Sequence, residues 1–275
     1  MMLNSPVNDL QVTHRQRLWL YAIAFLALFF LVAPIAIVFP ISFSDSRFLS
    51  FPPDGYSLRW YRHYFGSSEW MAATWVSLRI SVGACFLAGV LGVAAAYAIH
   101  QMGNRFGRWV EVTMLLPLMV PLIITAIGVF FVYAELGLIH TVPGLVLSHT
   151  MLTIPFVIVT ARSGLKSFDM NQEKAARSLG ASRLRAFIDV TLPQIRGSVI
   201  AGMIFAFIYA LDEVVVALFI SGGPNSTLTK RMFTALRDEI EPTIAAISSI
   251  LIVFSLLVVL LGILLGGGRK AQVSK

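Results

Sequence analysis

Long uncharged runs alternate with short polar stretches along this chain of 275 residues. An α-helix rises about 1.5 Å per residue, so roughly 20 apolar residues are needed to cross about 30 Å of hydrocarbon. Six runs approach or exceed this length, namely residues 18–44, 80–99, 112–134, 136–161, 197–220 and 243–268. We therefore predict an all-α membrane protein with six transmembrane helices.

The first run is predicted to be a retained transmembrane helix rather than a cleaved signal sequence. It follows Arg15 and Arg17. It is nevertheless longer than the apolar segment of a signal sequence, which has about 7–15 residues, and it lacks a cleavage site of small residues. Pro34 and Pro40 lie inside it and are expected to bend or end the helix.

Composition and charge agree with a membrane protein and indicate its orientation. Hydrophobic residues make up 57% of the chain and charged residues 13%, and the mean hydropathy is +0.80, far from the values of soluble domains. With a cytoplasmic N-terminus, most Lys and Arg residues fall in inner segments, as the positive-inside rule requires. Six spans then place the C-terminus in the cytoplasm too. The inner basic excess facing anionic lipid explains the net charge of +7, so no nucleic-acid partner is predicted.

No cofactor or metal site is predicted. The single cysteine, Cys85, lies in the second run, where it can form neither an intrachain disulfide nor a cysteine-based metal site. The histidines show no ligand spacing, and no glycine-rich loop has the G-x-x-x-x-G-K-[ST] spacing that cradles phosphate. The chain is therefore not expected to bind ATP by itself.

The loop at residues 45–70 is rich in aromatic and turn-forming residues. Tyr56 and Trp60 belong to it, and aromatic side chains of this kind suit the interface between membrane and water. Contact with an extracytoplasmic partner is the alternative interpretation.

A second polar segment, residues 162–196, is placed in the cytoplasm by the predicted topology and contains signals for two short helices. Asp169 marks the start of a helix at residues 171–179, and Gly180 is positioned to cap its C-terminus. Ser182 can cap a second helix at residues 183–191, which Pro193 is expected to stop. We therefore predict two helices hinged at Gly180.

The first of these helices has one face of mostly small residues. Gln172, Ala175, Ala176 and Leu179 recur at i, i+3, i+4 and i+7, so they share a side of the helix. Little side chain would separate the helix backbone from whatever packs on this face, which indicates a docking surface. An amphipathic helix lying at the membrane surface is the alternative.

This segment resembles the signature loop of permease subunits of ATP-binding-cassette (ABC) importers, whose consensus is E-A-A-x3-G-x9-I-x-L-P. Lys174 stands at the glutamate position, with Glu173 one residue earlier, and Val190 stands at the isoleucine position. The resemblance implies the type I importer permease fold, in which residues 162–196 form a coupling loop whose coupling helix sits on an ATPase subunit. The residues implied to serve this coupling are Glu173, Lys174, Ala175, Ala176, Leu179, Gly180, Val190, Leu192 and Pro193.

Within this family the similarity extends over almost the whole chain and points to the spermidine/putrescine branch, on residues 53–61, 148–169 and 211–222. Related permeases for ferric iron, opines and aminophosphonates share parts of these stretches and stay alternatives. The resemblance implies a multi-pass transport subunit of a bacterial inner membrane, not an enzyme, working by alternating access. Three regions are expected: residues 1–72 with the N-terminal tail, first helix and periplasmic loop, a five-helix core at 73–268, and a cytoplasmic tail at 269–275.

The partners implied by the resemblance are an ATPase dimer that binds the ATP, a periplasmic substrate-binding protein and a second permease subunit. In the polyamine branch this second subunit is usually a paralogue. Membrane lipid surrounds the whole assembly.

Two carboxylates, Asp212 and Glu213, interrupt the fifth run at membrane depth. Each costs roughly 2.5–3.5 kcal/mol there unless it is paired or faces water, so both are candidates for a substrate pathway. A cationic solute would gain most from them, and Tyr209, Tyr56 and Trp60 are candidate aromatic contacts.

Helical spacing places Glu213 on one stripe with small residues, which suits a helix that lines a cavity. The alternative is that the stripe is only close helix packing, with Glu213 paired to Arg79 or Lys230. The small residues of the stripe are Gly202, Ala206, Ala210 and Ala217.

Two other function classes fit the sequence less well. A secondary transporter usually has an inverted repeat and ion-coupling carboxylates, whereas this chain shows one acidic pair and no repeat. An intramembrane enzyme needs a nucleophile and a base on facing spans, and neither G-x-S-x-G nor H-E-x-x-H occurs. Co-purification with an ATPase would separate an importer from both.

Overall fold

The structure is a computed structural model that describes residues 17–103, 105–238 and 242–266. Over these ranges the chain forms helices and loops without a β-sheet, which confirms the predicted all-α class. An isolated antiparallel bridge joins Ser44 to Tyr56. Arg15 and the predicted tail at 269–275 lie outside the described residues.

The chain divides into two compact units, each described by itself. The first consists of residues 1–64 and 240–250, and it contains α1 (Leu18–Ser42), most of α2 (Arg59–Gly66) and the first turns of α12 (Thr243–Gly266). The second consists of residues 65–239 and 251–275. The other helices are α3 (Ser68–Met102), α4 (Arg105–Leu115), α5 (Leu122–Leu136), α6 (Val142–Ser167), α7 (Met170–Ser178), α8 (Arg183–Ala186), α9 (Leu192–Asp212), α10 (Val215–Ile220) and α11 (Leu228–Asp238). The three regions expected from the sequence stay a prediction.

Five helices of the described chain are long and apolar enough to cross a membrane, and a bent pair adds a sixth if it counts as one span. The five are α1, α3, α6, the stretch Arg183–Asp212 and α12. The bent pair replaces the continuous third span predicted at residues 112–134. Its two parts, Arg105–Leu118 and Leu122–Leu136, meet at 93°.

Two prolines explain this bend. Pro117 lies in the 3₁₀ helix Leu116–Leu118, and Pro121 directly precedes α5. Proline has no N–H and its ring clashes with the preceding turn, so a regular α-helix cannot continue through both positions.

Other helix ends also differ from the predicted runs. α6 begins at Val142 rather than at residue 136, because Gly137 and His140 have φ of 66° and 59° and Thr141 caps the helix. α1 contains both Pro34 and Pro40 and ends at Ser42, so neither proline terminates the helix at its own position.

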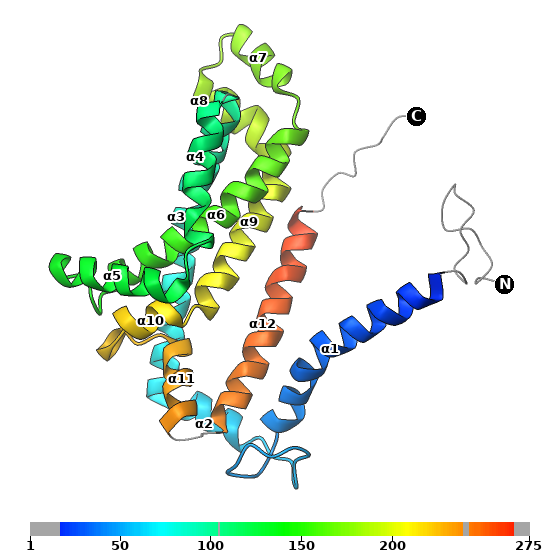
Figure 1. The fold of residues 1–275 in the computed structure, drawn as a ribbon, viewed down its shortest axis with the longest axis vertical. Coiled ribbons are helices and arrows are strands. Elements are labelled where there is room, and N and C mark those ends of the chain that lie inside the picture. Colours follow the sequence, from blue (N-terminus) through cyan, green and yellow to red (C-terminus); the bar gives the residue numbers. More distant parts are fainter. Residues whose placement is uncertain (1–16, 104, 239–241, 267–275) are drawn as a thin grey trace. The chain divides into compact units, whose positions relative to one another are not determined.

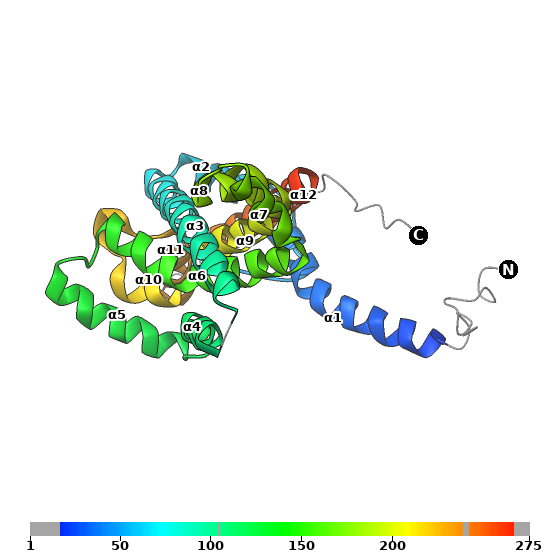
Figure 2. The same ribbon diagram turned by 90° about the horizontal axis from the view of Figure 1, so that it is seen from above.

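The second unit is built on α3, α6 and α9, which lie side by side (Figures 1 and 2). A Cβ atom added to Gly92 of α3 would lie 2.7 Å from Cβ of Val157 in α6. One added to Gly202 of α9 would lie 3.0 Å from Cα of the same valine. Because glycine allows this approach from both sides, the small-residue stripe of α9 serves helix packing at Gly202.

Different elements occupy the two ends of this three-helix group in the second unit. Figure 1 shows α7 and α8 at one end, while α10 and α11 lie toward the other. The fold therefore separates the coupling loop from the acidic pair at the end of α9.

In the first unit, hydroxyl groups connect three helices. The Tyr61 hydroxyl lies 2.8 Å from Oγ of Ser42 in α1 and 2.7 Å from Oγ of Ser249 in α12. His63 of α2 also contacts Thr243, the first residue of α12, at 3.1 Å.

Candidate functional site: the coupling loop and the acidic cavity

The coupling loop contains the capped helix that its sequence predicts. The carboxylate of Asp169 accepts the N–H of Asn171 at 3.0 Å and begins α7. Gly180 has φ of 95°, in the left-handed region that favours glycine. The Gly180 N–H donates to the Arg177 carbonyl at 3.0 Å and the Ala181 N–H to the Ala176 carbonyl at 3.2 Å. These two bonds form a Schellman motif, so the predicted cap at Gly180 is confirmed.

The second helix of the loop does not stop at Pro193. After α8 the chain makes a π-helical turn, Phe187–Thr191, and continues directly into α9. The prediction of a stop is wrong: Pro193 directly follows this π-helical turn, and a local π adjustment of this kind allows a membrane helix to continue through a proline. A single helical path, Arg183–Asp212, therefore leads from the coupling loop into the membrane.

The predicted docking face of α7 is exposed. Lys174 and Ala175 are exposed, Ala176 is partly buried, and Leu179 is 90% exposed. An exposed leucine on a face of small residues is an apolar surface with room for a close partner.

Other residues of the family motif lie inward instead. Val190 and Leu192 pack against the core formed by α3, α6 and α9, so they hold the loop rather than present a surface. Pro193 is exposed.

Glu173 has a structural role that the sequence analysis missed. Only 1% of it is exposed, and it lies between α7, α3 and the π-helical turn. The Tyr97 hydroxyl of α3 donates to its Oε1 at 2.5 Å, and the Thr191 hydroxyl donates to its Oε2 at 2.6 Å. Both carboxylate oxygens are thus occupied, which ties α7 to the helices that enter the membrane.

Aromatic contacts also link α3 to the segment that follows α7. The Tyr97 and Phe187 ring centroids are 4.7 Å apart, and the guanidinium of Arg183 lies 5.5 Å from the Tyr97 ring centroid. α3, α7 and α8 therefore meet around one tyrosine.

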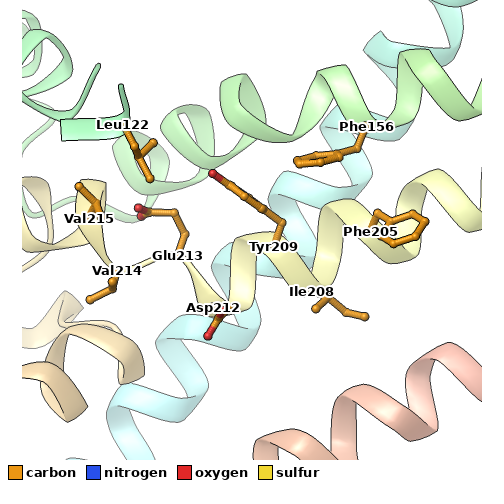
Figure 3. A pocket seen from close by; sticks show the side chains of 9 residues that line it. All are labelled: Leu122, Phe156, Phe205, Ile208, Tyr209, Asp212, Glu213, Val214 and Val215. Carbon is orange, nitrogen blue, oxygen red and sulfur yellow. The ribbon is translucent and has the colours of Figure 1, made fainter. Parts of the chain in front are cut away.

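The acidic pair lies at a cavity of about 360 Å³ in the second unit (Figure 3). Tyr209 also lines it, and its ring centroid is 5.1 Å from that of Phe156. The full lining is Leu122, Phe156, Phe205, Ile208, Tyr209, Asp212, Glu213, Val214 and Val215. The cavity is thus mostly aromatic and aliphatic, with acidic groups at one side.

Asp212 and Glu213 point in different directions (Figure 3). The side chain of Asp212 is exposed, and it also lines a neighbouring cavity of about 300 Å³ between α9 and α12. The Glu213 side chain points toward Leu122 and Val215 and is buried. Of the two, Asp212 is the acid that a solute in these cavities would meet.

Glu213 caps a helix where the fifth run breaks. α9 ends at Asp212, and Glu213 accepts the N–H groups of Val216 and Ala217 in α10 at 2.7 and 3.1 Å. A carboxylate at a helix N-terminus is stabilised by these donors and by the helix dipole. The predicted continuous span over residues 197–220 is therefore two helices joined at this acid.

The buried partner of Glu213 among the described residues is His149 of α6. Its Nε2 lies 3.6 Å from Oε2 of Glu213. The predicted partner Lys230 instead donates to the Ser221 carbonyl, and burial lowers the pKa of this lysine. Among the described residues, the basic side chain that lies within 4.0 Å of Glu213 is that of His149 rather than that of Arg79.

Tyr56 and Trp60 belong to the first unit, whereas the cavity belongs to the second. Tyr56 is 71% exposed, and Trp60 is buried with the guanidinium of Arg59 lying 4.6 Å from its ring centroid. This cavity therefore does not test the predicted contact of Tyr56 and Trp60 with substrate, which stays a prediction. Within residues 17–103, 105–238 and 242–266 there is no group of three or more His, Cys, Asp or Glu residues placed to hold a metal ion.

Comparison with known proteins relates this fold to a transport family. The family model for binding-protein-dependent transport system inner membrane components matches residues 88–267. The spermidine/putrescine transport system permease protein PotC of Escherichia coli K12 is 30% identical over 231 residues, covering 84% of this chain and 87% of PotC. The putrescine transport system permease protein PotI of the same strain is 30% identical over 255 residues, covering 90% of this chain and 89% of PotI.

A solved structure supports the fold. The crystal structure of a bacterial ABC transporter involved in the import of the acidic polysaccharide alginate aligns with a TM-score of 0.67 at 16% identity. The alignment covers 94% of this chain and 99% of that one. The importer permease fold expected from the coupling-loop motif is confirmed. The chain belongs to the family of binding-protein-dependent transport system inner membrane components and is a permease subunit of an ABC importer, not an enzyme.

Proposed function

We propose that this subunit imports polyamines such as spermidine or putrescine, along a pathway that includes Asp212. The observation that carries the proposal is the exposed carboxylate of Asp212 at a cavity otherwise lined mainly by aromatic and aliphatic side chains. A polyamine joins protonated amines through methylene chains, so its binding needs acidic groups beside apolar or aromatic surface. The similarity to PotC and PotI supports the same substrate class.

Asp212 is assigned the contact with the cationic amine, and Glu213 the support of the helix break. Both oxygens of Glu213 already accept backbone N–H groups. A charge-assisted hydrogen bond to one amine contributes about 1.5–3 kcal/mol, which corresponds to roughly a ten- to hundred-fold change in affinity. Tyr209 and Phe156 offer aromatic faces to the same cation.

The proposed assembly places both termini in the cytoplasm and the α7 face of Ala175 and Leu179 against an ATPase dimer. A second permease subunit, a paralogue of this chain, completes the pathway, and a periplasmic binding protein delivers the substrate. ATP binding closes the ATPase subunits and moves the coupling helices, so the pathway opens toward the loaded binding protein. ATP hydrolysis then resets it. This alternating access needs no ion gradient, unlike a secondary transporter.

The test is uptake of radiolabelled putrescine by proteoliposomes that contain the full complex and its binding protein. Unlabelled spermidine, ferric iron, an aminophosphonate and an opine are offered as competitors. We expect spermidine to compete and the others to fail. Competition by one of the others, with none from spermidine, would assign the cargo to that class instead.

Two variants with the same chemical change separate the roles of the two acids. Asp212→Asn should lower putrescine uptake about ten- to hundred-fold while assembly and basal ATPase activity are retained. Glu213→Gln should instead lower the thermal stability of the complex, because one helix N–H loses its charged acceptor. Native uptake by the Asp212→Asn complex would show that this acid is structural.

A further inference from the structure

A second polar cavity lies near the coupling loop, away from the acidic pair. It has a volume of about 300 Å³ and lies between the C-terminal turns of α3, the helix α4 and the end of α6. Figure 1 shows α4 running toward the end of the second unit that carries α7 and α8. Its lining residues are Ile99, His100, Gly103, Gly107, Arg108, Glu111 and Arg162. The proposed transport pathway uses none of them.

The charges of this cavity favour an anion. Two guanidinium groups, Arg108 and Arg162, face one carboxylate, Glu111, and His100 adds a further nitrogen donor or acceptor. Arg162 forms an ion pair with Glu111 through Nη1. The positive charge of Arg108 is left in excess over this pair.

Arg162 also has an unused donor. Its side chain is only 17% exposed, and its Nε is buried without a hydrogen-bond partner among the described residues. A buried donor without an acceptor costs free energy, and a phosphate oxygen in the cavity could accept from it. The cavity thus combines excess positive charge with an unsatisfied buried donor.

The surface of α4 indicates which kind of molecule carries the anion. Phe106 and Trp109 are 63% and 71% exposed, and Val112 continues the same face three residues later. Arg108, which lines the cavity, is exposed on this helix too. Exposed aromatic side chains combined with arginine are typical of a helix at the membrane interface, where acyl chains and headgroups are both within reach.

We propose that this cavity binds the phosphate group of an anionic phospholipid. Arg108 and Arg162 contact the phosphate oxygens, and the exposed apolar side chains of α4 contact the acyl chains. The phosphate chemistry alone would also admit free inorganic phosphate, and the experiment separates the two sources.

The test is native mass spectrometry of the purified full complex, titrated with phosphatidylglycerol or with phosphatidylcholine of the same chain length. We expect phosphatidylglycerol to bind at least about ten-fold more tightly. Arg108→Gln should remove about ten-fold of that affinity. The control Arg105→Gln makes the same charge change on the same helix outside the cavity lining, and it should change affinity by less than about two-fold. Equal affinity for both lipids, or equal losses in the two variants, would overturn the proposal.

A double variant tests the role of the buried Arg162 without leaving the charge of Glu111 unpaired. Arg162→Gln combined with Glu111→Gln should weaken phosphatidylglycerol binding like Arg108→Gln, with thermal unfolding as the check on folding. If this pair unfolds, the comparison of Arg108→Gln with Arg105→Gln still decides. Inorganic phosphate at millimolar concentration should displace the lipid partly, relative to chloride of equal ionic strength. Phosphate binding without any phosphatidylglycerol preference would refute the lipid source.

Discussion

Replacing Gly180 by valine tests whether the turn after α7 aims the coupling helix at the ATPase. Gly180 has φ of 95°, and a Cβ atom built there would have no other atom within 4 Å. The substitution therefore creates no steric clash with the rest of the protein. Its cost arises in the backbone, because a β-branched residue strongly disfavours positive φ.

The expected loss of activity in Gly180→Val follows from this conformational cost. A non-glycine residue held in the left-handed region costs about 1–3 kcal/mol, and 2 kcal/mol changes a conformational ratio roughly thirty-fold. The Schellman bonds from Gly180 and Ala181 fix how α7 joins α8. Since they depend on this φ, valine should lower the ratio of the native turn to other loop geometries by about this factor. Transport and substrate-stimulated ATPase activity should then fall together, by about ten-fold or more.

The assay compares stimulated ATPase activity of the reconstituted complex with its expression and membrane insertion. Gly180→Asn is the matched control, because asparagine also adds a side chain but tolerates the left-handed region. We expect Gly180→Asn to keep most of the activity and Gly180→Val to lose it, with both variants inserted normally.

Two outcomes would refute this reasoning. Native stimulated activity in Gly180→Val would mean that the turn does not position a coupling helix. An equal loss in Gly180→Asn would mean that the added side chain, and not the backbone conformation, disturbs the contact with the ATPase.

Two further predictions concern the anchor of α7 and the membrane topology. Glu173→Gln removes the charge that two hydroxyl groups contact, at a cost of about 1.5–3 kcal/mol, so stimulated ATPase activity should fall. The matched control Asp189→Asn makes the same acid-to-amide change at an exposed carboxylate and should keep the activity, whereas unchanged stimulation in Glu173→Gln would contradict the anchoring role. In a Cys85→Ser background, a cysteine replacing the exposed Ser68 should react with an impermeant thiol reagent outside spheroplasts, whereas one replacing Ser182 should not, and the opposite labelling would reverse the proposed orientation.

The sequence predicted best those features that depend on neighbouring residues. The apolar runs located the membrane helices, because crossing hydrocarbon requires length and composition alone. The cap at Gly180 was likewise predictable, since helix signals at Asp169 and a following glycine lie within one short segment. Pro117 and Pro121 are local signals for the bend. The uncharged run at residues 112–134 continues through both prolines, however, and its length alone predicts one continuous span.

Features made by distant residues were not predictable. Glu173 and Tyr97 are 76 positions apart, so no local pattern shows that the acid faces inward rather than toward a partner. The separate roles of Asp212 and Glu213 depend on a helix break that ordinary helical spacing does not anticipate. His149, which lies beside Glu213, comes from another helix altogether. In each case the tertiary structure decides which of two adjacent polar residues is exposed.

The placement of Thr191 connects the two candidate sites. It donates to Glu173 at 2.6 Å and immediately precedes α9, which runs 21 residues to Asp212. A helix of this length spans about 30 Å. If an ATPase displaces α7, the buried hydrogen bond transmits the displacement to α9 and thus to the cavity. The helical path is interrupted at Glu213. The carboxylate of Glu213 caps α10, while its neighbour Asp212 is the last residue of α9. A movement of α9 would therefore alter the position of Asp212. If Asp212 contacts the cation as proposed, this movement would expose its carboxylate to the substrate in one state and remove it in the other.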